Sequence, residues 1–267
     1  MATIVHKGIK LAYEEQGEGK PALVFVHGWA CNRSFFAPQA EYFSQHHRVV
    51  SVDLRGHGGS DKPEGEYPIA AYADDIAYLI EQLDLGKVIA VGHSMGGVAV
   101  LQLAAAFPDC VAGIVMVEPV RSLTQNSEES RARMAALVEA IEAGNEEPLR
   151  QYVTERFFLP FSDRKLLEAV LGVMTAMPGQ AAASGLRGIQ DFDGGAVAAR
   201  CKVPVLHIGA TPPLNPPHLV AQLLPGVIHG VTVGAGHFNQ LEVPDQVNAM
   251  IEAFLRHHVG DLHGRVQ

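Results

Sequence analysis

One serine stands in a setting that can make its hydroxyl group a nucleophile. Ser94 lies in Gly-His-Ser-Met-Gly (92–96), between an apolar run at Val88–Val91 and a helical pattern at Met95–Phe107. A Gly-x-Ser-x-Gly turn between a strand and a helix lifts the hydroxyl above the edge of a sheet, at the positive end of the helix dipole. We therefore predict that Ser94 attacks a carbonyl carbon. The alternative is a glycine-rich turn that only serves packing.

Attack on a carbonyl requires two N–H donors for the negatively charged oxygen that forms. The N–H of Met95 directly follows the nucleophile, and the N–H of Trp29 lies in the loop 27–29, after the apolar run Leu23–Val26. We predict that these two N–H groups form the oxyanion hole. The Trp29 side chain is also predicted to contact substrate, with packing on the core as the alternative. His27 is assigned a structural role, because no acid pairs with it.

Short apolar runs alternate with helical patterns around these motifs. The runs are continuous, which is typical of strands buried on both faces of a parallel sheet that helices cover. In the segment 69–83, apolar side chains recur every three or four residues, as in a helix. This alternation predicts an α/β fold with a mostly parallel sheet. The strands are expected at 4–6, 10–14, 22–26, 49–52, 88–91, 111–117, 203–208 and 227–233.

The interval 120–199 breaks the alternation. Strand-like runs disappear there and charged helical segments take their place. The interval is too long for a single crossover and too helical for a loop, so we predict a helical insertion. The remaining core then consists of residues 1–119 and 200–267. The inserted helices are expected at Ser127–Ala143, Pro148–Phe158 and Arg164–Met177.

The composition excludes several classes of protein. The 267 residues include 20 Lys or Arg and 29 Asp or Glu, and the resulting net charge of −9 disfavours nucleic acid or an anionic membrane as a partner. Cys31, Cys110 and Cys201 fit neither a disulfide framework nor a zinc site. No basic region followed by an apolar run opens the sequence, so we expect a cytoplasmic protein. We expect a small-molecule substrate and no metal or other cofactor, and a homodimer is left open.

Four motifs together identify a family resemblance. They are Val-His-Gly-Trp (26–29), Asp-Leu-Arg-Gly-His-Gly-Gly-Ser-Asp (53–61), Gly-His-Ser-Met-Gly-Gly (92–97) and Gly-Ala-Gly-His-Phe (234–238). They resemble the α/β-hydrolase superfamily over nearly the whole chain except the insertion, whose position matches the cap of that family. The resemblance implies an eight-stranded α/β-hydrolase sheet with an inserted helical cap. It says little about substrate, because one fold hosts many reactions.

The resemblance also indicates the catalytic base. His237 follows the last strand and a Gly-Ala-Gly turn, where the catalytic histidine of the family stands. An exposed loop histidine is the alternative. In an ordinary environment, His237 would give activity a pH midpoint near neutrality. Within the second motif, Asp53, Arg55 and His57 are assigned structural roles in a loop.

The catalytic acid is where this sequence departs from the family. The usual aspartate follows the strand 203–208, but the turn here reads Gly-Ala-Thr-Pro-Pro (209–213), and no Asp or Glu occurs from 202 to 241. Glu118 instead follows the strand Val111–Val117, at an edge where active-site groups converge. It resembles the acid of haloalkane dehalogenases and zearalenone-type lactonases, which comes from this strand. We predict that Glu118 orients His237. The alternative is a buried glutamate that caps loop amides.

These residues predict a serine hydrolase of carboxylic esters or lactones. Serine at position 94 argues against dehalogenases and epoxide hydrolases, which use aspartate, whereas thioesterase, amidase and carbon–carbon bond hydrolase activities stay open. A cofactor-free dioxygenase acting on a hydroxyquinolone-like substrate is the alternative from another reaction class, and a hormone receptor is the non-enzymatic one. Phe158 in the cap and Phe238 beside the base are predicted, with Trp29, to bind the substrate; packing within the cap is the alternative for Phe158.

Overall fold

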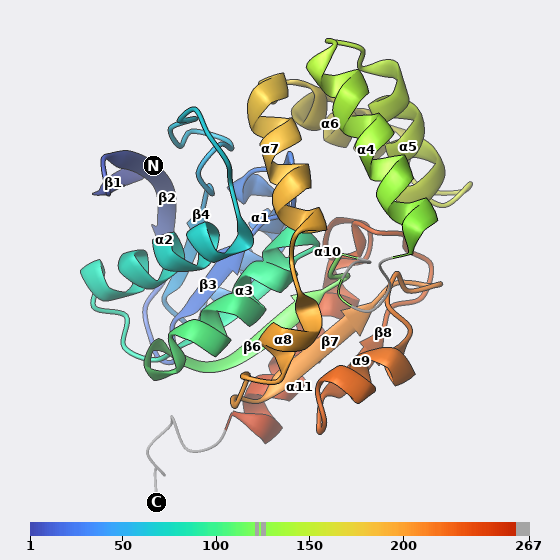
Figure 1. Cartoon of the computed structure of the whole chain (residues 1–267). Coiled ribbons are helices and arrows are strands. Elements are labelled where there is room, and N and C mark those ends of the chain that lie inside the picture. The colour runs from blue at the N-terminus through green and yellow to red at the C-terminus, as the bar shows by residue number, and fades with distance from the viewer. Residues whose placement is uncertain (121–122, 124–126, 260–267) are drawn as a thin grey trace, which may run out of the picture.

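An eight-stranded sheet runs through the described part of the chain, residues 1–120, 123 and 127–259 of the computed structural model (Figure 1). The strands lie in the order β1-β2-β4-β3-β5-β6-β7-β8, and all pairs are parallel except β1 with β2 and β2 with β4. The predicted mostly parallel eight-stranded sheet is therefore confirmed, with each strand end within two residues of its expected position. The strands are β1 Ala2–His6, β2 Ile9–Gln16, β3 Leu23–Val26, β4 Val49–Val52, β5 Val88–His93, β6 Val111–Val117, β7 Val205–Gly209 and β8 Ile228–Val231.

Helices cover both faces of this sheet (Figure 1). Because side chains alternate along a strand, Val24 and Val26 of β3 join the apolar core beneath α2 and α3. Leu23 and Phe25 join a separate core beneath α1 and α11 on the opposite face. The two apolar cores therefore pack against opposite faces of the sheet. The elements of these layers are η1 Arg33–Phe36, α1 Ala37–Phe43, α2 Ile69–Gln82, α3 Met95–Ala106, η2 Pro108–Cys110, α8 Gly194–Ala198, α9 Pro217–Leu223, α10 Asn239–Glu242 and α11 Pro244–His258.

Four helices between β6 and β7 stand apart from these layers. Figure 1 shows α4–α7 grouped beyond the ends toward which the parallel strands point. Residues 121–122 and 124–126, at the start of the predicted cap, lie outside the described residues, and α8 lies within the predicted interval 120–199 but contacts α3. The division into core and cap at residues 119 and 200 stays a prediction. The helices are α4 Glu128–Glu142, α5 Glu147–Phe157, α6 Arg164–Thr175 and α7 Gly179–Gln190.

Helix α7 is absent from the sequence-based prediction, and its glycines explain why. Glycine lowers helix propensity, so the segment 179–190 has a weak helical signal. Its packing requires glycine, however: a Cβ atom on Gly188 would lie 2.2 Å from the carbonyl oxygen of Tyr67. Tertiary contact therefore decides this helix. In the described residues, no single helix is long and apolar enough to cross a membrane, although the bent pair α6–α7 meets the same criteria of length and composition.

Candidate active site

The turn between β5 and α3 holds Ser94 in a conformation that few side-chain-bearing residues adopt. Its φ is +53°, and its N–H donates to the carbonyl of Val117 at 3.0 Å. A Cβ atom on Gly92 would lie 2.1 Å from the carbonyl oxygen of Gly96, and one on Gly96 would lie 2.1 Å from that of Val26. Both glycines are therefore sterically required. The turn fixes Ser94 at the N-cap of α3, where the helix dipole is positive.

Two backbone N–H groups beside Ser94 are available to an acceptor. In residues 1–120, 123 and 127–259, neither the N–H of Trp29 nor that of Met95 donates to a turn, loop or side-chain oxygen. The loop that carries Trp29 lies close to the serine, since a Cβ atom on Gly28 would be 3.1 Å from the Cβ of Ser94. This arrangement is compatible with an oxyanion hole. The roles of Trp29 and Met95 stay predictions.

The loop after β8 brings His237 into the same region. Its N–H donates to the carbonyl of Phe157 at 2.7 Å, and its ring stacks on the Phe157 ring with centroids 4.2 Å apart. Nε2 of His93 donates to the carbonyl of His237 at 2.9 Å. His93 therefore supports this loop, a role that no sequence signal marks.

The environment of His237 differs from the one expected. The residue is only 4% exposed, and burial lowers its pKa from the ordinary 6.5 to about 3. The imidazole is then neutral at physiological pH and able to accept a proton. The expected pH midpoint near neutrality assumed an ordinary environment, and burial removes that assumption.

Glu118 lies behind His237 at the end of β6. Its φ is +44°, its side chain is buried, and Oε2 lies 3.5 Å from Nδ1 of His237. This separation is an ion-pair distance, longer than a normal hydrogen bond, and catalytic hydrogen bonds of this kind often tighten only when substrate is bound. Among the described residues, Nδ1 of His237 has no hydrogen-bond partner. Glu118 is therefore the carboxylate toward which this nitrogen can turn.

The turn after β7 holds the Glu118 carboxylate in place. The N–H of Ala210 donates to Oε1 at 2.5 Å, and the N–H of Leu214 lies 3.3 Å from Oε2. Glu118 thus does cap backbone amides, as the alternative interpretation expected, but these amides belong to the segment where the family's usual acid would stand. Both interpretations describe part of its contacts, because one oxygen faces the turn while the other also faces His237.

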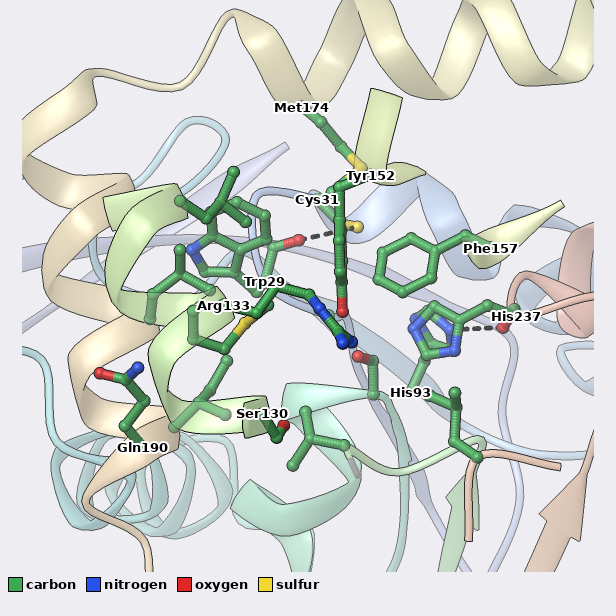
Figure 2. A pocket seen from close by; sticks show the side chains of 18 of the residues that line it. Trp29, Cys31, His93, Ser130, Arg133, Tyr152, Phe157, Met174, Gln190 and His237 are labelled. Atoms are coloured by element: carbon green, nitrogen blue, oxygen red, sulfur yellow. Dashed lines mark hydrogen bonds between the residues drawn. The ribbon is translucent and has the colours of Figure 1, made fainter. Parts of the chain in front are cut away.

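A cavity lies over Ser94 and His237, between the sheet edge and helices α4–α7 (Figure 2). Trp29 and Phe238 line it, as the substrate-binding prediction requires. Phe158 does not line it: this side chain lines a neighbouring cavity instead, and Phe157 faces the Ser94 cavity. The neighbouring cavity shares Phe157 and His237 with the Ser94 cavity, so the role of Phe158 in substrate binding stays a prediction. The described residues that line the cavity are Gly28, Trp29, Cys31, His93, Ser94, Val120, Ser130, Arg131, Arg133, Met134, Leu137, Tyr152, Phe157, Met174, Leu186, Ile189, Gln190, Leu214, His237 and Phe238.

The Trp29 side chain connects the oxyanion loop to the helices above it. Its Nε1 donates to the carbonyl of Ala182 in α7 at 2.8 Å. A Cβ atom on Gly185 would lie 2.9 Å from Cδ1 of the indole, so α7 packs directly against the ring. Trp29 therefore lines the cavity and also contacts α7, one of the helices that cover it.

The second motif forms a structural network beneath the site. Asp53 is buried and accepts from Nη1 of Arg33 at 2.6 Å and from the N–H of Gly59 at 2.8 Å. Arg55 binds both carboxylate oxygens of Asp75, at 2.6 and 2.7 Å. Asp53, Arg55 and His57 are absent from the described lining of the Ser94 cavity. These contacts agree with the structural roles assigned to them.

One cluster elsewhere has metal-ligand chemistry. His6, Asp74 and Asp75 bring ligand atoms within 4.8 Å of one another. Cationic side chains already bind both carboxylates, since Arg55 pairs with Asp75 and Nζ of Lys7 lies 2.6 Å from Asp74. The donors of this cluster are thus engaged within the protein, and the cluster is not among the residues near Ser94.

Comparison with known proteins identifies the family of the chain. The family model described as alpha/beta hydrolase fold matches residues 21–244. The 2-(acetamidomethylene)succinate hydrolase of Mesorhizobium japonicum is 43% identical over 110 residues, which span 41% of the chain and 39% of that relative. A thermophilic esterase from Thermogutta terrifontis (malate bound) matches with a TM-score of 0.85 and 25% identity, covering 95% of the chain and 96% of the esterase. The enol-lactonase from Burkholderia xenovorans LB400 matches with a TM-score of 0.84 and 25% identity, covering 96% and 100%.

Proposed function

The chain belongs to the α/β-hydrolase family, and we propose that within it the protein is a serine hydrolase of carboxylic esters or lactones. The observation that carries the proposal is the convergence of three groups: Ser94 and His237 line one cavity, and Glu118 contacts His237 from behind. The similarity to an esterase and to an enol-lactonase supports the choice of ester or lactone.

The proposed reaction begins with attack of the Ser94 hydroxyl oxygen on the carbonyl carbon. His237 accepts the hydroxyl proton, a new oxygen–carbon bond forms, and the N–H groups of Trp29 and Met95 bind the oxyanion. His237 then donates the proton to the leaving oxygen as its bond to the carbonyl carbon breaks. Glu118 stabilises the imidazolium that exists between these steps. Water attacks the acyl-enzyme by the same route and releases the acid.

A buried imidazolium depends strongly on its carboxylate neighbour. Burial penalises the charged form of His237, which is why its pKa is lowered in the resting state. The ionised form of Glu118 offsets this penalty only when the proton has arrived, and therefore favours the transition state over the resting state. The N–H groups of Ala210 and Leu214 donate to the carboxylate and orient it.

An amide is the second candidate for the bond that is cleaved. The relative from Mesorhizobium japonicum is named as a hydrolase of an acetamido compound, and its matched segment is the most similar of the three reported. The same serine chemistry cleaves amides when His237 protonates the leaving nitrogen. Rates on matched ester and anilide substrates of butyrate distinguish the two.

Removal of the Ser94 hydroxyl tests the proposal. We expect Ser94→Ala to lower kcat on 4-nitrophenyl butyrate by about 10⁴-fold or more, and to abolish covalent labelling by a fluorophosphonate, as followed by intact-protein mass spectrometry. Ser130→Ala is the matched control, because it removes another hydroxyl from the same cavity. Retained turnover or labelling in Ser94→Ala would contradict the nucleophile assignment. Oxygen consumption with a hydroxyquinolone would instead favour the dioxygenase alternative.

A further inference from the structure

The cavity over Ser94 has a local charge opposite to that of the whole chain. The chain has a net charge of −9, yet the charged side chains among the described lining residues are Arg131 and Arg133, with no Asp or Glu. The lining histidines His93 and His237 are neutral, because burial lowers the pKa of both. Coulomb attraction is stronger beside low-polarity walls than in open water. Glu118, Glu129 and Glu155 line the neighbouring cavity, so the net positive charge is confined to the Ser94 cavity itself, where it can bind an anion.

The position of Arg133 in α4 directs its side chain toward the reacting groups. Ser130, Arg133, Met134 and Leu137 recur at spacings of three and four residues, so they share one helix face. Leu137 is buried and fixes that face over the cavity. Figure 2 shows the Arg133 guanidinium extending into the cavity on the side of Tyr152 and His237.

The partner that Arg133 has in this structure is easily replaced. Its Nη2 lies 2.6 Å from Oε1 of Glu129, one helical turn earlier, and Glu129 is 83% exposed at its side chain. Solvent screens exposed pairs of this kind, and they contribute little to stability. The Arg133 side chain is 41% exposed, and a carboxylate that enters the cavity could make two parallel hydrogen bonds with its guanidinium. Substrate can therefore take the place of Glu129.

From this geometry we infer that Arg133 selects substrates that carry a free carboxylate close to the scissile ester or lactone. The inference rests on the proposed function and specifies its substrate class. The substrate carboxylate binds the guanidinium, and the Tyr152 hydroxyl lies on the same side of the cavity (Figure 2). The carbonyl carbon then faces Ser94, while apolar side chains such as Met134 and Phe157 contact the chain between the two groups.

A pair of esters that differ in one group tests the inference. Monoethyl succinate and ethyl butyrate have the same leaving group and a four-carbon acyl chain, and they differ in a terminal carboxylate or methyl group. Ethanol release gives kcat/KM for both. We expect wild-type protein to favour monoethyl succinate by at least about tenfold. Arg133→Ala should lower this preference at least tenfold, mainly through the KM of the succinate ester, and Arg133→Lys should lower it less.

The chain offers a matched control for the charge change. Arg256 pairs with Glu252 at 2.9 Å with the same spacing of four residues, on α11, and it lines neither the Ser94 cavity nor its neighbour. Arg256→Ala should leave the preference within about twofold of wild type. A wild-type preference for ethyl butyrate, or an equal change of preference in Arg133→Ala and Arg256→Ala, would overturn the inference.

A binding measurement separates this inference from the proposed function. In the Ser94→Ala background, calorimetric titration with succinate should detect binding that Arg133→Ala removes and Arg256→Ala retains. Absence of succinate binding counts against the anion site and leaves the serine hydrolase proposal intact. Succinate binding that depends on Arg133, together with ester turnover that survives Ser94→Ala, supports the anion site and counts against the proposed nucleophile.

Discussion

The carboxyl ends of β6 and β7 are neighbours in the sheet, yet they supply opposite chemistry. The strands pair in parallel, with Val117 opposite Ile208. The end of β6 carries a buried carboxylate, Glu118, whereas the end of β7 carries backbone N–H donors from Ala210 and Leu214. In the resembled family, the acid commonly stands at the second of these ends.

The position of the carboxylate therefore matters more than the strand that carries it. Oε1 of Glu118 occupies the space within the turn after β7, and Oε2 faces Nδ1 of His237. A histidine base requires only that a carboxylate reach this nitrogen. Because adjacent parallel strands end at the same edge, either strand can supply it.

Supplying the acid from β6 also requires that the buried carboxylate of Glu118 be stabilised. A buried carboxylate without partners is strongly unfavourable, so it must receive hydrogen bonds. The turn after β7 has no acid of its own and donates N–H groups to Glu118, which offset this cost. The two strand ends therefore form one unit, and changes at either end should affect His237.

The largest effect on activity is expected from Glu118→Gln, which removes the carboxylate at the end of β6. The amide cannot stabilise an imidazolium and favours the wrong tautomer of His237, so kcat should fall about 10³-fold. Turnover of 4-nitrophenyl butyrate measures this loss. Glu155→Gln is the control, because Glu155 lines the neighbouring cavity with Glu118 and its carboxylate accepts from the Gln151 side chain. Nearly full activity in Glu118→Gln would indicate a Ser–His dyad.

Acidification should destabilise both strand ends. His237, beside Glu118, and His207, in β7, are buried, and burial lowers the pKa of each to about 3 and about 4. The unfolded chain binds protons near pH 6.5 and the folded chain does not, so stability is complete above 6.5 and falls below it. Each histidine should remove about 1 kcal/mol per pH unit from the free energy of unfolding between pH 6 and 4.

Urea unfolding at several pH values measures this loss. His27, His57 and His93 are buried with lowered pKa values and add to the effect. His207→Gln serves as the internal comparison, since it should reduce the slope by the contribution of one histidine. A free energy of unfolding that stays constant from pH 7 to 5 would contradict the buried, neutral state of these side chains.

Moving the acid to the end of β7 tests whether the two strand ends are interchangeable. Pro213 lines the neighbouring cavity with Glu118 and His237. In a Glu118→Ala background, Pro213→Asp should restore kcat about tenfold relative to Glu118→Ala alone, because a carboxylate again reaches the imidazole. Pro213→Asn is the isosteric control without charge. Equal activity of the Asp and Asn variants would show that the location of the carboxylate at β6 is required.

The smallest effect is expected for the pH dependence of activity near neutrality. Because burial lowers the pKa of His237, the base stays neutral from pH 8 to 6, and kcat/KM should change less than about twofold. Activity should decline only as the pH falls further toward about 3. A midpoint near 6.5 would mean that Glu118 outweighs burial in setting the charge of His237.

The core motifs were predictable because local sequence rules apply to them. The Gly92–Gly96 turn follows from backbone sterics between a strand and a helix, and the strand runs follow from continuous apolar stretches. The cavity wall was less predictable. No sequence signal indicated that Phe157 lines the Ser94 cavity, and none indicated that Gly188 lets α7 pack closely against the backbone of Tyr67.

The sequence contains no signal that marks Arg133 as a residue of the cavity. The spacing of Ser130, Arg133, Met134 and Leu137 marks a helix face, but a single arginine on a charged helix has no distinguishing feature. Its relation to Ser94 depends on how α4 is placed over β5, about 40 residues earlier in the chain. No local rule describes such a distant contact.

The fold class, the serine turn and the absence of an acid after β7 can be predicted from the sequence, because each depends on residue types within short segments. Three other features emerge only in the folded structure: Glu118 reaches both His237 and Ala210, His237 is buried, and Arg133 lines the cavity. These depend on distances between segments far apart in the chain. Packing of the whole fold sets such distances, and a one-dimensional pattern does not contain them.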